Sequence, residues 1–153
     1  MNTAALLRET EQFLHVQIPL THAMGVRVAV YDETRLILTA PLQPNHNHLG
    51  TAFGGSLSAI ATLAGYALLW LELGDRHAHI VVKESAISYR HPVRGEISAC
   101  AARPERTAVA EFKRRFKEKG KAKIRLDVTM SHGSQLCVTF TGVYVALAAD
   151  AVA

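Results

Sequence analysis

Apolar and polar residues alternate along much of the chain, and a period of two predicts β-strands. In residues 25–42 the alternation runs on both sides of the polar turn Asp32-Glu33-Thr34, with apolar side chains at Val26, Val28, Val30, Leu36, Leu38 and Ala40. This pattern is typical of a β-hairpin. Further strands are predicted at 79–93, 96–104, 122–132 and 136–147, the last two joined by the tight-turn dipeptide Gly133-Ser134.

Other stretches carry apolar residues at the spacing of an α-helix. Residues 3–16 predict an amphipathic helix. Ile18-Pro19 is expected to end it, because a proline disfavours the helical conformation of the residue before it. Residues 105–119 predict a second helix, with Gly120 at its C-terminal cap. Together with the strands, these helices predict an α+β fold with a mostly antiparallel sheet, and 153 residues suit a single domain, 1–153.

The longest predicted helix runs to Leu73 and is apolar on every face from Leu57 onwards. Such a helix is either the core of a folded domain or a membrane span. The run is short for a span, Glu72 lies inside its end, and the amphipathic strands on either side need an apolar partner to cover. We therefore expect a core helix and no membrane partner. We also expect Glu72 and Glu96 to contact solvent, because one lies at a helix end and the other at a strand start.

A polar segment leads directly into this helix, which starts at Gly54-Gly55-Ser56. Glycines let another group approach the backbone, and the first N–H groups of a helix carry about half a positive charge. Under a sheet, this end can stabilise a carbonyl oxygen or a developing oxyanion. A flexible glycine turn capped by Ser56 explains the same residues, so both interpretations stay open.

The net charge of +4 is concentrated in one segment. Residues 105–125 hold nine Lys or Arg and three Glu, so the rest of the chain is near neutral or slightly acidic. Such a segment either attracts anions, phosphorylated cofactors included, or is a solvated helix face. Nucleic acid is not expected, because Phe112 and Phe116 share the inward face with Val109, whereas single-strand binders need exposed aromatic rings.

The cysteines and histidines do not form a recognisable metal site. They are two isolated cysteines and two His-x-His pairs: Cys100, Cys137, His46/His48 and His77/His79. The cysteines match no zinc spacing and are expected to be free thiols, while the histidine pairs lack an acidic third ligand and fall in or beside predicted loops. From this spacing we expect no bound metal. The first sixteen residues do not match a secretory signal, so we expect a cytoplasmic protein.

Motifs in the polar segment resemble those of hotdog-fold acyl-CoA thioesterases of the PaaI type. In that family N-x-x-G-T-x-[HF]-G-G opens a long apolar helix, and this chain reads NHLGTAFGG at 47–55. The chain is more similar still to thioesterases resembling the YiiD C-terminal domain, whose APL-x-PN, T-x-F-x-GS and TL-x-G motifs match residues 40–45, 51–56 and 62–65. The likeness continues through IVVKESAISYRHPVRG at 80–95 and covers nearly the whole chain.

The resemblance implies a hotdog fold, in which an antiparallel sheet wraps around the long central helix, here with an extra basic helix between late strands. It also implies a homodimer with a continuous sheet, or a dimer of dimers, with the site at the dimer interface. The implied substrate is an acyl thioester of coenzyme A or of acyl-carrier protein, and no cofactor is implied. The thioester carbonyl is expected to meet the helix start at Gly54 or Gly55, beside Ser56.

One departure from the family bears on the chemistry. PaaI-type enzymes carry an aspartate eight residues after the first glycine of the pair, where this chain has Thr62, which cannot act as a carboxylate base. Glu84, where the YiiD-like relatives commonly have Asp, is the candidate base, with Asn47 orienting substrate or water and Thr62 donating a supporting hydrogen bond. Pairing of Glu84 with a basic neighbour, turn formation by Asn47 and helix back-bonding by Thr62 are the structural alternatives.

Two functions therefore follow from the sequence: hydrolysis of an acyl thioester, or non-catalytic binding of acyl-CoA, since the usual aspartate is missing. For either one, Tyr66 and Trp70 farther along the long helix form the floor of an acyl tunnel or belong to the core. We expect the phosphates of coenzyme A to be held by basic side chains of the helix 105–119 and of the strand end near residue 92, namely Arg114, Arg115, Lys117, Arg90 and Arg94.

Overall fold

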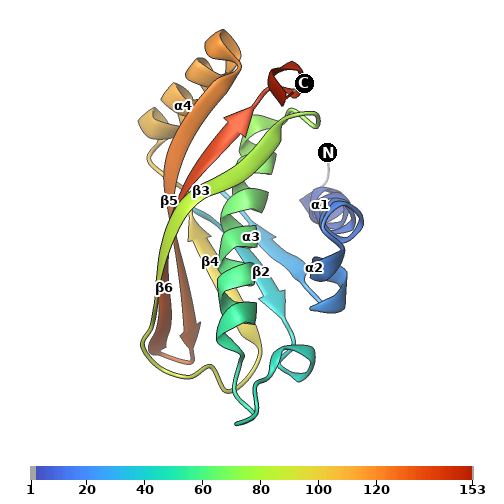
Figure 1. Ribbon diagram of the computed structural model, residues 1–153, viewed down its shortest axis with the longest axis vertical. Coiled ribbons are helices and arrows are strands. Elements are labelled where there is room, and N and C mark those ends of the chain that lie inside the picture. Colours follow the sequence, from blue (N-terminus) through green and yellow to red (C-terminus); the bar gives the residue numbers. More distant parts are fainter. Residues whose placement is uncertain (1–2, 153) are drawn as a thin grey trace.

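The computed structural model describes residues 3–152, in which one antiparallel sheet curves around a central helix (Figure 1). The helices are α1 (Thr3–Gln17), α2 (Pro19–Ala23), α3 (Gly54–Leu73) and α4 (Arg106–Lys119), with short 3-10 helices η1 (Gln43–Asn45) and η2 (Ala149–Val152). The strands are β1 (Arg27–Tyr31), β2 (Arg35–Ala40), β3 (His79–Tyr89), β4 (Ile97–Ala102), β5 (Lys121–His132) and β6 (Gln135–Leu147). These elements confirm the predicted order, and α2 is an addition to it that begins at a proline, a residue well suited to the first turn of a helix.

The strands pair in the order β1-β2-β4-β5-β6-β3, and every neighbouring pair is antiparallel. Both predicted hairpins are confirmed, as β1-β2 and β5-β6. In the first hairpin turn, the Asp32 carboxylate accepts hydrogen bonds from the backbone N–H groups of Thr34 at 2.8 Å and Arg35 at 3.1 Å. Strand β3 is the last in the sheet and pairs only with β6 within residues 3–152, so its other edge is open.

Helix α3 lies against the inner face of the sheet and supplies much of the core. Its residues Ile60, Ala64 and Leu68 are fully buried, and burying one large aliphatic side chain contributes about 1.5–3 kcal/mol. By length and composition α3 is apolar enough to cross a membrane, yet 61% of that apolar window is buried inside the molecule. This is the environment predicted for a core helix.

A glycine lets α3 approach the sheet closely. A methyl group at Gly65 would overlap the ring of Tyr144 on β6. The Tyr144 side chain is buried, which raises its pKa, and its hydroxyl donates to the backbone oxygen of Thr62 at 2.8 Å. This contact fixes the position of α3 along β6 and therefore the place where the helix begins.

Trp70 belongs to the core and not to the floor of a tunnel. Its side chain is 1% exposed, and its ring stacks on Phe13 of α1 with centroids 4.4 Å apart. The guanidinium of Arg76 lies 3.7 Å from the centre of the same ring, and Arg76 also pairs with Glu9 of α1 at 3.3 Å. These contacts hold α1 against the side of α3, whereas Tyr66 is only half-buried.

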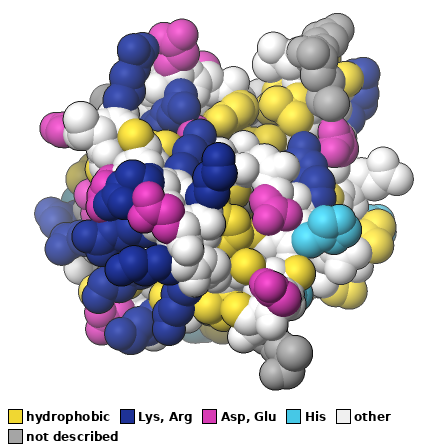
Figure 2. All heavy atoms as spheres, turned by 90° about the horizontal axis from the view of Figure 1, so that it is seen from above, with side chains coloured by type: hydrophobic (Ala, Val, Ile, Leu, Met, Phe, Trp, Pro, Cys, Tyr) yellow, Lys and Arg dark blue, Asp and Glu magenta, His cyan; other side chains and the backbone are white. Residues whose placement is uncertain are grey.

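Helix α4 connects β4 to β5, where the sequence predicts the basic helix. It buries Val109 and Phe112 and ends at Gly120, whose N–H donates to the Phe116 oxygen at 2.8 Å in the left-handed backbone region. Figure 1 places α4 at one end of the molecule and the loop before α3 at the other. Figure 2, a view from the α4 end, shows Lys and Arg side chains gathered over one side of that end.

Candidate active site

The start of α3 opens into a hollow. No side chain caps the helix, so the N–H groups of Gly54, Gly55 and Ser56 have no partner within it. The adjoining hollow has a volume of about 250 Å³, and its polar lining includes Asn47, Thr51, Gly54, Tyr89, Arg90 and His91. The positive end of the helix dipole therefore faces a space that can receive a polar group of a ligand.

Two asparagines shape the loop that leads into α3. Asn45 is buried, and its amide nitrogen donates to two backbone oxygens at 2.8 Å each. The Asn47 oxygen accepts from the N–H groups of Leu49 at 2.8 Å and Thr51 at 3.2 Å, while its nitrogen donates to the Thr51 hydroxyl at 2.9 Å. Asn47 thus borders the hollow with its amide engaged in the loop, which is the turn-forming alternative for this residue.

Aromatic rings flank the two glycines at the start of α3. The Tyr89 hydroxyl donates to the Gly54 oxygen at 3.2 Å, and a methyl group on Gly54 would lie 3.6 Å from the Tyr89 ring. The Phe53 ring lies across Gly55 so closely that a methyl group there would overlap it, although Phe53 itself is 55% exposed. Gly55 therefore permits the close approach of an aromatic ring to the helix start.

The strand end brings one predicted phosphate ligand to the hollow. Arg90 lines it, directly after β3, and its backbone N–H donates to the Cys137 oxygen at 2.7 Å. Arg94 is exposed and follows Val93, whose oxygen accepts from Ala52 in the loop before α3 at 2.9 Å. The structure therefore brings Arg90 and Arg94 to the same end of the molecule as the glycines.

Thr62 lies on the side of α3 that carries Gly55, two turns further along. Its hydroxyl donates to the Ser58 oxygen of the preceding turn at 2.9 Å. This is the helix back-bonding alternative for the residue. Ser56 is half-buried in the first turn and does not cap the helix.

The structure does not bring Glu84 to the helix start. Strand β3 contains a β-bulge: Val82 pairs with Tyr144, but Glu84 pairs with Val143, which leaves Lys83 as an extra residue. Side chains alternate between the two faces of a sheet, so an extra residue turns every later side chain to the opposite face. Because the buried Tyr144 faces α3, its neighbour Val143 and the paired Glu84 face away from it.

Glu84 is also distant from the helix start along the strand. It precedes Tyr89 by five residues, which is roughly 16 Å in an extended strand. Ser85 follows the bulge and takes the inward-facing position, opposite Gly142. Strand β3 does reach the helix start through Tyr89, but within one chain it does not bring the predicted base, Glu84, to that point.

The basic helix is likewise remote from the glycines within one chain. Lys113 of α4 contacts Glu72 near the C-terminal end of α3, and an α-helix of twenty residues spans about 30 Å (Figure 1). The structure therefore separates the predicted phosphate ligands into a pair near the glycines, and a group at the far end of α3 that comprises Arg114, Arg115 and Lys117.

Ion pairs within α4 engage two residues of that far group. Glu111 binds Arg114 at 2.6 Å and Arg115 at 2.8 Å, and Arg114 also binds Glu118 at 2.7 Å. Hydrogen bonds from Arg114 and Arg115 lower the pKa of Glu111 to about 2. Arg114 is thus held between two carboxylates, as expected for a solvated helix face.

Tyr89 and His91 line the hollow but are not among the residues predicted from the sequence. They lie where β3 ends, just before the strand-ending Pro92. An aromatic residue and a histidine beside a strand-ending proline are an ordinary sequence pattern. Only the pairing of β3 with β6, together with the position of α3, brings this strand end back to Gly54.

Among residues 3–152, no three His, Cys, Asp or Glu side chains lie close enough together to hold a metal ion. His46 uses its ring nitrogen Nδ1 in a hydrogen bond with the Asn47 oxygen at 2.8 Å. Cys100 and Cys137 are free thiols, as predicted, and Cys137 is buried.

Comparison with known proteins places the chain in a family. Residues 7–148 match the family described as "Putative thioesterase (yiiD_Cterm)". The chain belongs to this thioesterase family. The match includes the loop before α3, the whole of α3 and all of the sheet, so the site described above lies within it.

Solved structures of similar chains share the fold. A protein of unknown function from Chlorobaculum tepidum is 33% identical, with 94% of each chain covered and a TM-score of 0.86. A protein from Shewanella oneidensis described as a "putative thioesterase" is 28% identical, with 95% of this chain and 99% of that chain covered and a TM-score of 0.82. A Pseudomonas aeruginosa thioesterase is 15% identical with a TM-score of 0.71, and this likeness is evidence of a shared fold and of nothing further. The predicted hotdog fold is confirmed.

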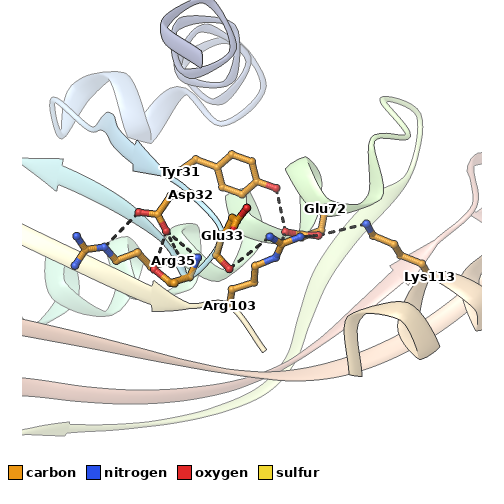
Figure 3. Close-up of polar contacts among 8 residues, drawn as sticks. Tyr31, Asp32, Glu33, Arg35, Glu72, Arg103 and Lys113 are labelled. Carbon is orange, nitrogen blue, oxygen red and sulfur yellow. Dashed lines mark hydrogen bonds and ion pairs between the residues drawn. The ribbon is translucent and has the colours of Figure 1, made fainter. Parts of the chain in front are cut away.

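In this member of the thioesterase family, a second polar cluster lies at the C-terminal end of α3 (Figure 3). The Glu72 side chain is 2% exposed, so the predicted contact with solvent is wrong. It accepts hydrogen bonds from Arg103 Nη2 and from the Tyr31 hydroxyl, each at 3.0 Å. Arg103 Nε and Lys113 Nζ form ion pairs with it at 2.7 Å and 3.3 Å. Burial and the charge of Glu72 raise the pKa of Tyr31 to about 12, so its hydroxyl remains a donor at neutral pH.

The cluster around Glu72 joins α3 to α4, β1 and the residue that follows β4. We expect Glu72→Gln to lower the free energy of unfolding by about 2–3 kcal/mol, because it leaves two cations without a buried counter-ion. The loss is smaller than for a fully buried pair, since Arg103 and Lys113 are partly exposed. Urea denaturation measures it.

Glu118→Gln is the matched control, because that residue pairs with Arg114 on the exposed face of α4. It should change the free energy of unfolding by less than about 0.5 kcal/mol. Equal losses in the two variants would contradict a special role for Glu72.

Proposed function

We propose that this chain hydrolyses an acyl thioester at the start of α3. The observation that carries the proposal is the uncapped, glycine-rich start of a buried helix that opens into a hollow, in a chain of the thioesterase family. Fixed N–H groups in a water-poor site stabilise a developing oxyanion with little reorganisation. Gly54 and Gly55 place no side chain between these groups and the thioester carbonyl.

We assign proton transfer to His91. Among the described residues that line the hollow, it alone carries an imidazole or a carboxylate, and histidine is the commonest general base in enzymes. A water oxygen attacks the carbonyl carbon while its proton passes to the imidazole. The resulting oxyanion accepts hydrogen bonds from the N–H groups of Gly54 and Gly55. The C–S bond then breaks, and the leaving thiolate takes the proton from the imidazolium.

We also propose that two copies form a homodimer through β3. This strand leaves one edge unpaired and exposes apolar side chains, including Val81 at 50% and Tyr89 at 52%. Unpaired edges with apolar side chains are covered in natural proteins, and a two-fold axis pairs identical edges. A dimer of dimers is the other assembly that the proposal allows.

The size of the hollow favours a shared site. At about 250 Å³ it is below the roughly 300–1,000 Å³ typical of a small-molecule pocket. Beside β3, the surface of α3 carries half-exposed small or polar residues, Ser58, Ala59 and Thr62, followed by Tyr66. A second copy on the β3 edge would roof this strip, and the acyl chain of the thioester would lie along it.

A non-catalytic acyl-CoA binding protein is the second candidate. The observation that favours it is Thr62, which stands where PaaI-type enzymes carry aspartate and whose hydroxyl is engaged within the helix. The same helix start would then bind the thioester carbonyl without activating water. Hydrolysis and binding are separated by the experiment that follows.

The function is tested by release of free thiol from acyl-CoA and acyl-carrier-protein substrates of several chain lengths. We expect turnover of at least one substrate, and His91→Gln should lower kcat by about 10²–10⁴-fold with little change in KM. Glu84→Gln should retain activity close to that of the parent chain, because its side chain faces away from α3.

Loss of activity in Glu84→Gln with full activity in His91→Gln would return the role of base to Glu84. Tight binding of acyl-CoA without hydrolysis of any substrate would establish the binding protein instead.

Sedimentation velocity tests the assembly. At micromolar concentration we expect a dimer or a dimer of dimers and no substantial monomer. Val82→Lys, on the open strand, should shift the distribution towards monomer, because it adds a charge to a strand edge that would be buried. Leu136→Lys is the control, since that residue is equally exposed but lies at the β5-β6 turn. A monomer in the parent chain would rule out the shared site.

A further inference from the structure

A second hollow, of about 360 Å³, lies on the outer face of the sheet at the end where α4 meets β5. Five cationic side chains line it, together with Ala122 and Val145, and no acidic side chain is among the described lining residues. The cations are Lys83, Arg115, Lys119, Lys121 and Lys123. They belong to the end of the molecule where Figure 2 shows Lys and Arg side chains gathered.

Three segments of the fold bring these cations together. Gly120, at φ 65°, turns the chain from α4 into β5 and so places Lys119 beside Lys121. Lys121 and Lys123 are two residues apart on a strand and therefore share a face. Lys83 is the extra residue of the bulge in β3, and bulges commonly redirect a side chain. The hollow is thus a convergence of separate segments and not a run of neighbours on one helix.

The cations of this hollow are mostly unpaired. Arg115 binds Glu111, whereas none of the four lysines forms an ion pair with an acidic residue in the described part of the chain. Like charges gathered in a concave site repel one another and raise the local concentration of anions. A volume of about 360 Å³ is within the range of small-molecule pockets and exceeds the needs of one phosphate group.

We propose that this hollow binds the phosphate groups at the nucleotide end of a coenzyme A thioester. The inference rests on the proposed function and names the carrier of its acyl group. Coenzyme A carries a diphosphate and a ribose phosphate, which suits several converging cations. Of the phosphate ligands predicted on α4, Arg115 lines this hollow. Lys117 lines a different hollow, and Arg114 is paired with two carboxylates.

Pairing of two copies places this hollow and a helix start at the same end of the sheet. Within one chain the two lie at opposite ends of α3 (Figure 1). If two β3 edges pair antiparallel, the two-fold axis reverses one strand relative to the other. The start of α3 in one copy then lies at the end of the joint sheet that carries the basic hollow of the other copy. The helix start lies on the inner face of the joint sheet and the hollow on its outer face. A thioester bound at one helix start would therefore pass around this end of the sheet to place its phosphates on the opposite subunit.

Binding of adenosine 3′,5′-bisphosphate, which resembles the nucleotide end of coenzyme A and has no thioester, tests the site by calorimetry at low salt. We expect saturable binding to the parent chain, and a loss of affinity of at least about tenfold in the double variant Lys83→Ala/Lys121→Ala. Arg8→Ala/Arg106→Ala removes the same charge from exposed positions outside the hollow and should retain parental affinity. The same Lys variant should raise KM for acyl-CoA but not for acyl-pantetheine, which lacks the nucleotide, with kcat unchanged.

Several results would overturn the inference: no binding by the parent chain, an equal loss in the control, or a loss of affinity only for an acidic carrier protein. Hydrolysis of acyl-CoA with an unchanged KM in the Lys variant would overturn it and leave the proposed function standing. Specific nucleotide binding without hydrolysis of any thioester would support the site and remove the proposed activity.

Discussion

Burial of α3 against the inner face of the sheet is the constraint on which the rest of the molecule depends. Most of the helix surface is apolar, so the helix has to be covered on most of its sides. The sheet covers one side, and α1 covers another through the stack of Phe13 on Trp70. Close contact at Gly65 sets the position of the helix along β6. The remaining strip, beside β3, is where a second copy would complete the cover.

The two ends of this buried helix differ in whether their polar groups have partners within the chain. At the C-terminal end, Glu72 is buried but meets Arg103, Tyr31 and Lys113, so its charge is compensated. At the N-terminal end no side chain supplies the missing hydrogen bonds, and Gly54 and Gly55 keep the backbone accessible. The first end stabilises the fold. The second leaves polar groups free for a ligand, which is the arrangement expected of a site that binds an oxyanion.

Much of the fold follows from the residue pattern, because period and turn chemistry act locally. The β1-β2 and β5-β6 hairpins, the core helix α3 and the basic helix α4 are all where the sequence predicts them. Glu84 shows where such reasoning ends. Unbroken alternation after Ile80 and Val82 would turn Glu84 towards α3, but one extra residue, Lys83, reverses the faces. A bulge of this kind has no clear signature in a single sequence.

The candidate site was harder to predict than the fold for a related reason. Gly54 and Gly55 are recognisable from the sequence, because their motif consists of consecutive residues. His91 and Tyr89 reach the same hollow from a different strand end, and only the register of β3 on β6 brings them there. The charge of 105–125 is evident in the sequence, but the turn at Gly120 and the bulge at Lys83 decide which of its side chains converge.

The central claim, that the free N–H groups at the start of α3 bind the thioester carbonyl, is tested most directly by amide NMR. The ligand is a ketone analogue of acyl-CoA in which a methylene replaces the thioester sulfur, so the carbonyl remains and cannot be hydrolysed. The account predicts saturable shifts of the Gly54 and Gly55 amide resonances, while Gly74 at the opposite end of α3 stays unchanged. Saturable binding of the analogue with no shift at Gly54 or Gly55 would contradict it.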